Sequence, residues 1–93
     1  MATLRERKAC REKVMQALYE AVEGNRLLGV TGAKLHDDLG VPEDDLAAAC
    51  MYLVGEGLIT VDWTAGNTPS MVTLTHQGIR LMEAAEEEAE ENG

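Results

Sequence analysis

The residues of this sequence that could carry out catalysis or bind a metal are few and far apart. The two histidines, His36 and His76, have no serine or cysteine motif beside them, and Cys10 and Cys50 lack the spacing of zinc ligands. The acidic pairs and triplets at 37–38 and 43–45 do not alternate as calcium ligands do. The chain also has no glycine-rich phosphate loop. The sequence therefore predicts a protein that is not an enzyme and that holds no cofactor and no metal.

The same four residues have structural interpretations. His36 follows Leu35 in a helical pattern, which predicts a partly buried, hydrogen-bonded side chain, with pH sensing as the alternative role. His76 falls in the first turn of a helix and is expected to be exposed. Two unpaired cysteines at helix positions predict reduced thiols in a cytoplasmic protein.

Charge is unevenly distributed along the 93 residues, which carry 17 acidic and 8 basic side chains and a net charge of −9. Residues 1–13 hold five of the cations against two acids, whereas residues 83–91 hold six glutamates. The basic cluster is either a solvated helix end or an arm that contacts phosphate. The candidate phosphate contacts are Arg5, Arg7, Lys8, Arg11 and Lys34. The net acidity disfavours non-specific binding to nucleic acid or anionic lipid, although salt adaptation would also explain it.

Length and composition predict one small domain with a modest core. Hydrophobic residues make up 45% of the chain but include no phenylalanine, so the core must be aliphatic. Small aliphatic domains often gain stability by oligomerising, and we expect a homodimer. The charged N-terminus lacks the apolar segment of a signal peptide, and no apolar run approaches the roughly 20 residues of a membrane span. We expect no membrane partner and a cytoplasmic location.

Helix signals divide the first half of the chain into three segments. Thr3 and Glu6 have the spacing of a capping box for a helix that ends near Gly24. Its apolar stripe consists of Cys10, Val14, Ala17, Leu18, Ala21 and Val22. Residues 27–30 predict a short strand. Thr31 then caps a helix over residues 32–39, and Gly40 ends it.

The stretch from Val41 to Ile59 predicts a helix that turns directly into a strand. Leu46, Cys50 and Leu53 share one helical face, and Gly57 supplies a left-handed stop. Residues 58–64 and 71–74 predict a hairpin around a turn at 65–70. Thr75 caps a final helix. We expect residues 1–85 to form the domain and residues 86–93 an acidic, frayed tail.

The segment TGAKLHDDLGVPEDDLAAACMYLVGEGLI resembles the helix-turn-helix core of the winged-helix superfamily, as found in bacterial and archaeal regulators. The matching framework residues are Leu35, Leu39, Gly40, Val41, Leu46, Cys50, Leu53, Gly57, Leu58 and Ile59. LTHQGIRLMEA at 74–84 resembles the junction that follows the wing. The resemblance covers residues 10–85. It implies an α+β winged helix with a three-helix core, a β-hairpin wing and a C-terminal helix.

The resemblance implies DNA binding, with the helix between Val41 and Gly57 in the major groove. The outward residues of that helix argue against it, because none is Lys, Arg, Asn or Gln, the side chains that read purines or neutralise phosphate. The wing, residues 60–73, contains Asp62 and no cation.

We therefore interpret the chain as a winged-helix module that acts through protein contact in a regulatory role. A sequence-specific DNA-binding regulator is the alternative. The predicted interaction face of the third helix comprises Asp44, Asp45, Ala48, Met51 and Tyr52. Dimerisation is expected through the first and last helices, where the basic start of one can meet the glutamate-rich end of the other, within or between chains.

Overall fold

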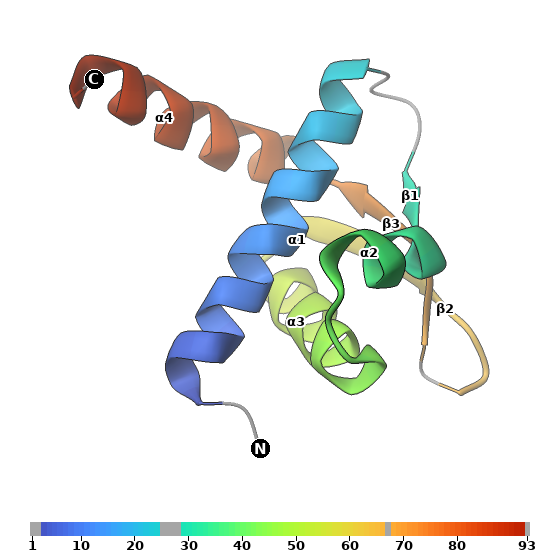
Figure 1. Ribbon diagram of the computed structural model, residues 1–93. Helices are drawn as coiled ribbons and strands as arrows, with labels where there is room; N and C mark the ends of the chain where they lie inside the picture. Colours follow the sequence, from blue (N-terminus) through green and yellow to red (C-terminus); the bar gives the residue numbers. More distant parts are fainter. Residues whose placement is uncertain (1–2, 25–28, 67, 93) are drawn as a thin grey trace.

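The fold is described from a computed structural model, which covers residues 3–24, 29–66 and 68–92. Four helices and three strands follow one another along the chain (Figure 1): α1 (Leu4–Gly24), β1 (Val30–Thr31), α2 (Gly32–Leu39), α3 (Glu43–Gly55), β2 (Ile59–Trp63), β3 (Pro69–Leu74) and α4 (His76–Asn92). This is the expected α+β winged helix, with α2 and α3 as the helix-turn-helix and β2 and β3 as the wing. Residues 27, 28 and 67 of the predicted strand and turn lie outside the described residues.

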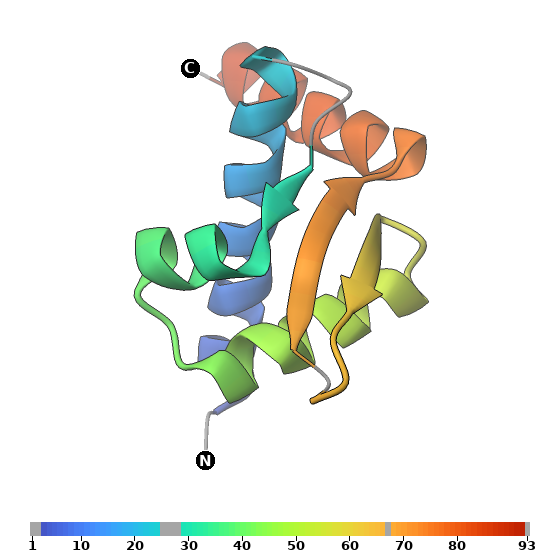
Figure 2. The same ribbon diagram turned by 90° about the vertical axis from the view of Figure 1, so that its right-hand side faces the viewer.

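The three strands form one antiparallel sheet in the order β1-β3-β2. Val72 lies at its centre, paired with Val30 on one side and Val61 on the other. Figure 2 shows the sheet crossing in front of α1, with β1 leading directly into α2. The sheet thus closes one side of the helical core.

The wing differs from its prediction at one end. β3 begins at Pro69 instead of Met71, because Pro69 pairs with Trp63 and the backbone N–H of Thr64 donates to the carbonyl of Thr68 at 2.9 Å. Proline has no N–H to donate, and it is tolerated here because it is the first residue of the strand. Because β3 begins two residues earlier than predicted and β2 ends at Trp63, the hairpin loop is shorter than the expected six residues. The register of the hairpin also shifts between Asp62 and Trp63.

The core lies where α1, α3 and the sheet meet. Its fully enclosed side chains include Val14, Leu18, Leu35 and Ile59, each of which contributes about 1.5–3 kcal/mol by burial. The predicted face of α3 is confirmed, since Leu46, Ala49, Cys50 and Leu53 are all buried. On α1, Met15 is also buried, although the predicted stripe omitted it.

The predicted helix boundaries are set by the expected groups. Thr3 Oγ1 accepts from the Glu6 N–H at 3.2 Å, and Thr31 Oγ1 accepts from the Lys34 N–H at 3.1 Å. Gly40 and Gly57 have positive φ angles of 63° and 75°. Pro42 is the N-cap residue of α3, which begins at Glu43.

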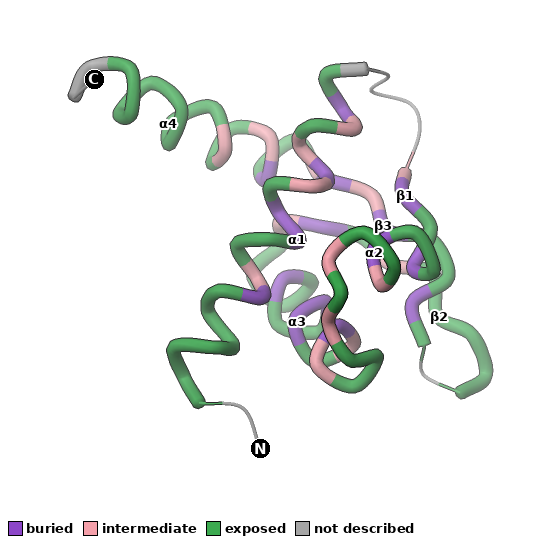
Figure 3. The backbone as a smooth tube through the Cα atoms, viewed as in Figure 1, coloured by how far each residue is buried: buried purple, intermediate pink, exposed green. Residues whose placement is uncertain are grey.

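The first half of α4 packs on the core of the domain. Ile79 and Met82 contact the core, whereas residues 83–90 are exposed (Figure 3). The helix nevertheless continues to Asn92, through the segment expected to fray. Glutamate and alanine have high helix propensity, which accounts for helix without packing.

Candidate interaction site

The outward face of α3 is apolar in its second half and acidic at its start. Met51 is 63% exposed and Tyr52 is 49% exposed, and Ala48 is also exposed between them and the first turn. Asp44 is exposed, whereas Asp45 is half-buried. All five predicted face residues lie on α3, and four of them are exposed.

A groove of about 540 Å³ runs between the start of α1 and this face of α3. Its α1 side contains Arg7, Arg11 and Lys13. Its α3 side contains Asp45, Ala48, Ala49 and Tyr52. Two of the candidate phosphate contacts, Arg7 and Arg11, therefore lie beside the predicted interaction face of α3. The sequence predicted the basic cluster and this face as two separate features.

Arg11 links the two walls of the groove. The carbon of its guanidinium group lies 3.8 Å from the centre of the Tyr52 ring, a distance typical of a cation–π interaction. Such a contact contributes about 0.5–1 kcal/mol at an exposed site. The contact holds the Arg11 charge over the face of the Tyr52 ring.

The groove is electrostatically mixed. Three cations face two acids, Glu6 and Asp45, so the local excess is one positive charge. Cys10 lies at the floor, with its thiol 3.8 Å from the Asp45 carbonyl oxygen. Burial, and next the charge of Asp45, raise the pKa of the Cys10 thiol, so it stays protonated and is a poor nucleophile.

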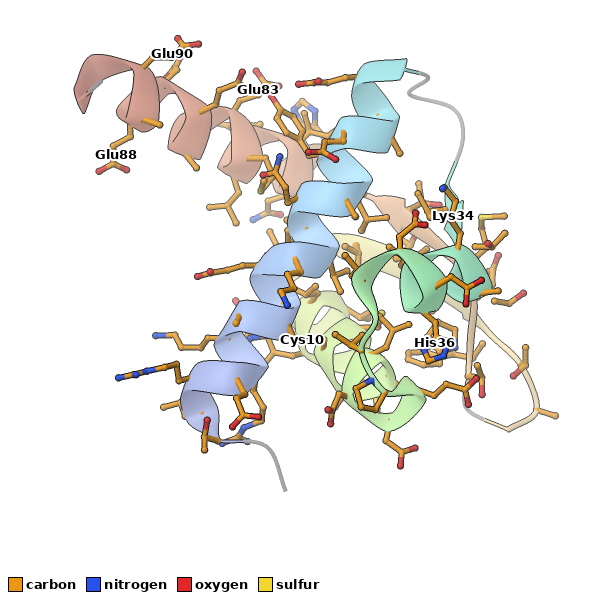
Figure 4. All side chains as sticks on the ribbon, viewed as in Figure 1. Cys10, Lys34, His36, Glu83, Glu88 and Glu90 are labelled. Carbon is orange, nitrogen blue, oxygen red and sulfur yellow. The ribbon has the colours of Figure 1, made fainter. Side chains whose placement is uncertain are left out.

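The remaining candidate phosphate contacts lie elsewhere. Arg5 and Lys8 are exposed on α1 and do not line the groove. Lys34 Nζ lies 2.8 Å from Asp38 Oδ2, one turn along α2 (Figure 4). This bond raises the pKa of Lys34, and it pairs the ammonium group with a carboxylate of the same helix. The five candidates therefore do not form a single cluster.

The wing presents an apolar surface without cations. Trp63 and Met71 are each more than one third exposed, and Asp62 is the charged residue of β2. A smaller hollow, of about 240 Å³, lies between α2 and the start of β3 and is lined partly by His36 and Glu43.

His36 has the structural role that the sequence predicts. It is half-buried, and its Nδ1 donates to the carbonyl of Val41 at 2.7 Å (its place on α2 is labelled in Figure 4). The bond spans the turn between α2 and α3. His76 is exposed, as predicted.

No group of three or more histidine, cysteine or acidic side chains in residues 3–24, 29–66 and 68–92 is placed to hold a metal ion. Cys50 is fully enclosed, and burial raises the pKa of its thiol to about 11. Within the same part of the chain, no helix is long and apolar enough to cross a membrane.

Two features of the groove were missed at the sequence level. Lys13 belongs to the basic run but was not singled out, and the contact of Arg11 with Tyr52 joins residues of two different helices. The helical period does carry a signal for the first, because Arg7, Cys10 and Lys13 follow one another at three-residue steps. No sequence signal identifies the second.

The comparisons with known proteins agree with this architecture. No protein-family model matches the chain, and no curated protein matches it. Among solved structures, the chain is similar to a MarR family regulator from Neisseria meningitidis, with a TM-score of 0.60 and 22% sequence identity. The similarity covers 88% of this chain and 57% of the other, so this chain spans a little over half of that regulator's length. At this identity, the match establishes the winged-helix fold.

Proposed function

We propose that this chain is a non-enzymatic winged-helix module that acts in the cytoplasm, in a regulatory role, by binding another protein through the outward face of α3. The observation that carries the proposal is the character of that face. Ala48, Met51 and Tyr52 are exposed behind an acidic first turn, and no side chain among them can neutralise phosphate or read a purine.

The same face has the features of a protein interface. Protein interfaces typically have an apolar centre, enriched in methionine and aromatic residues, with polar and charged residues around it. Tyrosine is also common among the residues that contribute most of the binding energy. The contact with Arg11 already orients Tyr52, which lowers the entropy lost when a partner binds. Glu43 and Asp44 at the rim favour a partner with basic residues opposite them.

The alternative is a sequence-specific DNA-binding regulator with α3 in the major groove. Two observations favour it: the likeness to a protein described as a MarR family regulator, and the position of Arg7, Arg11 and Lys13 beside α3. The acids in the same groove and the cation-free wing oppose it. We also propose that the module works as a homodimer that uses α1 and α4, the helices outside the helix-turn-helix.

Binding to random duplex DNA at increasing salt separates the two functions. A DNA-binding form that neutralises four phosphates would show a slope of about −3.6 in a plot of log affinity against log salt concentration. Neutralising Arg5, Arg7, Lys8 and Arg11 together would then abolish binding, while the control Arg80→Gln on α4 would not. That result would overturn the protein-contact proposal. Absence of binding even at low salt would remove the DNA alternative.

A positive test places a photoreactive amino acid at Met51 and, as a control, at Asp37, which is exposed on α2. We expect crosslinking to a protein partner in cells from position 51 and not from position 37. Crosslinks from position 51 to nucleic acid would contradict the proposal.

A further inference from the structure

The basic start of α1 and the acidic end of α4 do not meet within one chain. Tyr19 Oη donates to Glu86 Oε2 at 2.7 Å, so α4 crosses α1 in the second half of α1. Arg7 lies twelve residues before Tyr19, about 18 Å away along the helix at 1.5 Å per residue. Figures 1 and 2 both show α4 leading away from the end of α1 that carries the cations. The basic start of α1 and the acidic end of α4 are therefore both available to bind another molecule.

α4 has two different faces over residues 79–88. Ile79, Met82 and Glu86 lie on the side that packs on the domain. Leu81, Ala84, Ala85 and Glu88 occupy the opposite side at steps of three and four residues, and all four are exposed. Leu81 alone is 50% exposed. This face is a narrow apolar strip with glutamates beside and beyond it, and Figure 4 shows Glu88 and Glu90 extending from the free end of the helix.

The groove between α1 and α3 is complementary to that face. Its floor is formed by the small side chains of Cys10, Ala48 and Ala49, which allow a helix with alanines to approach closely. Arg7 and Lys13 stand on the α1 side, where glutamates of an incoming helix would lie. The basic segment from Glu6 to Lys13 is about 12 Å long, and residues 83–90 of α4 have the same length.

We propose that the acidic end of α4, residues 81–90, docks in the α1–α3 groove of a second copy of this chain. The α4 end of each chain binds the groove of the other, so the same contact is made twice and the two chains form a two-fold dimer. The groove of one chain then binds the α4 glutamates of the other chain, which the α4 helix of its own chain does not bring to the groove.

Docking covers Ala48 and Tyr52 and leaves Met51 outside the groove. Self-association therefore competes with any partner that requires Tyr52, and it removes Arg7 and Lys13 from contact with phosphate. The assembly itself does not depend on the proposed function, because it is measured on the purified chain without partner or DNA.

The test is a charge exchange followed by sedimentation equilibrium at low and high salt. One variant carries Arg7→Glu with Lys13→Glu, and a second carries Glu87→Lys with Glu88→Lys. All four side chains are exposed, and Arg11 keeps its contact with Tyr52, so circular dichroism should show an unchanged fold. Asp37→Lys with Glu56→Lys is the matched control for the tail variant, because it makes the same charge change at exposed sites away from the groove.

We expect a wild-type dimer that weakens with salt, and at least about a tenfold increase in the dissociation constant of each groove or tail variant. An equimolar mixture of the two variants should associate again, since each groove then faces a tail of opposite charge. The control should dimerise as the wild type does. A monomeric wild-type chain, a dimer unaffected by either variant, or a mixture that does not associate would overturn the proposal.

Discussion

At the scale of single residues, the glycine of the LTHQG motif marks a close approach of two backbones. A Cβ atom at Gly78 would lie 2.2 Å from the carbonyl oxygen of Leu58, which neither backbone can avoid by a side-chain rotation. Gly78 thus allows the first turn of α4 to rest on the start of the wing. The motif reflects packing, and it carries no chemistry of its own.

Gly78→Ala should lower the free energy of unfolding by about 1–3 kcal/mol, the usual cost of overpacking. Gly55→Ala is the control, because a Cβ at Gly55 meets no atom within 4 Å and alanine favours helix by up to about 1 kcal/mol. Urea denaturation of both variants measures the difference. Equal stability of the two would contradict the close approach.

The two cysteines should be unreactive in the folded chain. Burial raises the pKa of Cys50 to about 11, so at pH 8 its thiol is neutral in the folded state and partly ionised in the unfolded state. Iodoacetamide should modify neither cysteine at pH 8 until urea is added, as measured by mass spectrometry. Rapid labelling of Cys50 without denaturant would contradict this arrangement.

The same shift has a consequence for stability. Because the folded-state pKa is the higher one, the contribution of Cys50 is complete below the unfolded-state pKa of about 8.5. This contribution declines as the pH rises from about 8.5 to 11, because over that range the Cys50 thiol ionises in the unfolded state but stays protonated in the folded state. The free energy of unfolding should therefore fall over this range more steeply in the wild type than in Cys50→Ala.

At the scale of elements, Thr75 connects the wing to α4. Its hydroxyl donates to the carbonyl of Gly57 at 2.7 Å and accepts from the N–H of Gly78 at 3.1 Å. One side chain therefore caps the helix and holds the end of the α3–β2 turn. The predicted cap is confirmed, while its second bond could not be predicted from local sequence.

Thr75→Ala should cost about 1–2 kcal/mol of unfolding free energy, since it removes a cap and leaves the Gly57 carbonyl without this donor. Thr75→Ser retains the hydroxyl and should recover most of the loss. Chemical denaturation of the pair tests the claim. A serine variant as unstable as the alanine variant would show that the methyl group, and not the hydroxyl, matters.

The hydrogen bond from Tyr19 to Glu86 ties the outer half of α4 to α1. It raises the pKa of Tyr19 to about 12, because the phenol is held in its protonated, donating form. Tyr19→Phe should leave overall stability nearly unchanged and increase amide hydrogen exchange after residue 86. Unchanged exchange there would mean that the outer half of α4 is held by other contacts.

At the scale of the whole molecule, the α1–α3 groove, with its small excess of positive charge, lies apart from the acidic end of α4. If the chain dimerises as proposed, its melting temperature must depend on protein concentration, because association stabilises the folded state by mass action. Scanning calorimetry between about 5 and 200 µM should show an increase of the melting temperature. The variant with Arg7→Glu and Lys13→Glu should lose most of it. A concentration-independent wild type would exclude a folded-state dimer in this range.

The sequence alone determined most of the local structure. Helical period placed Leu46, Cys50 and Leu53 inward, and the threonines and glycines at the helix ends placed the caps, because both signals act over a few residues. The exposed face of α3 follows from the same period. The start of β3 was predicted two residues late, since only pairing with Trp63 admits Pro69 to the strand.

Only the tertiary structure decided which surfaces stand together. The cations of α1 and the apolar face of α3 form one groove because the core side chains of the two helices, such as Val14 and Cys50, pack in a single cluster. The contact of Arg11 with Tyr52 and the separation of the two charged helix ends follow from that packing. Such relations join residues far apart in the chain, and no local pattern records the angle at which two helices cross.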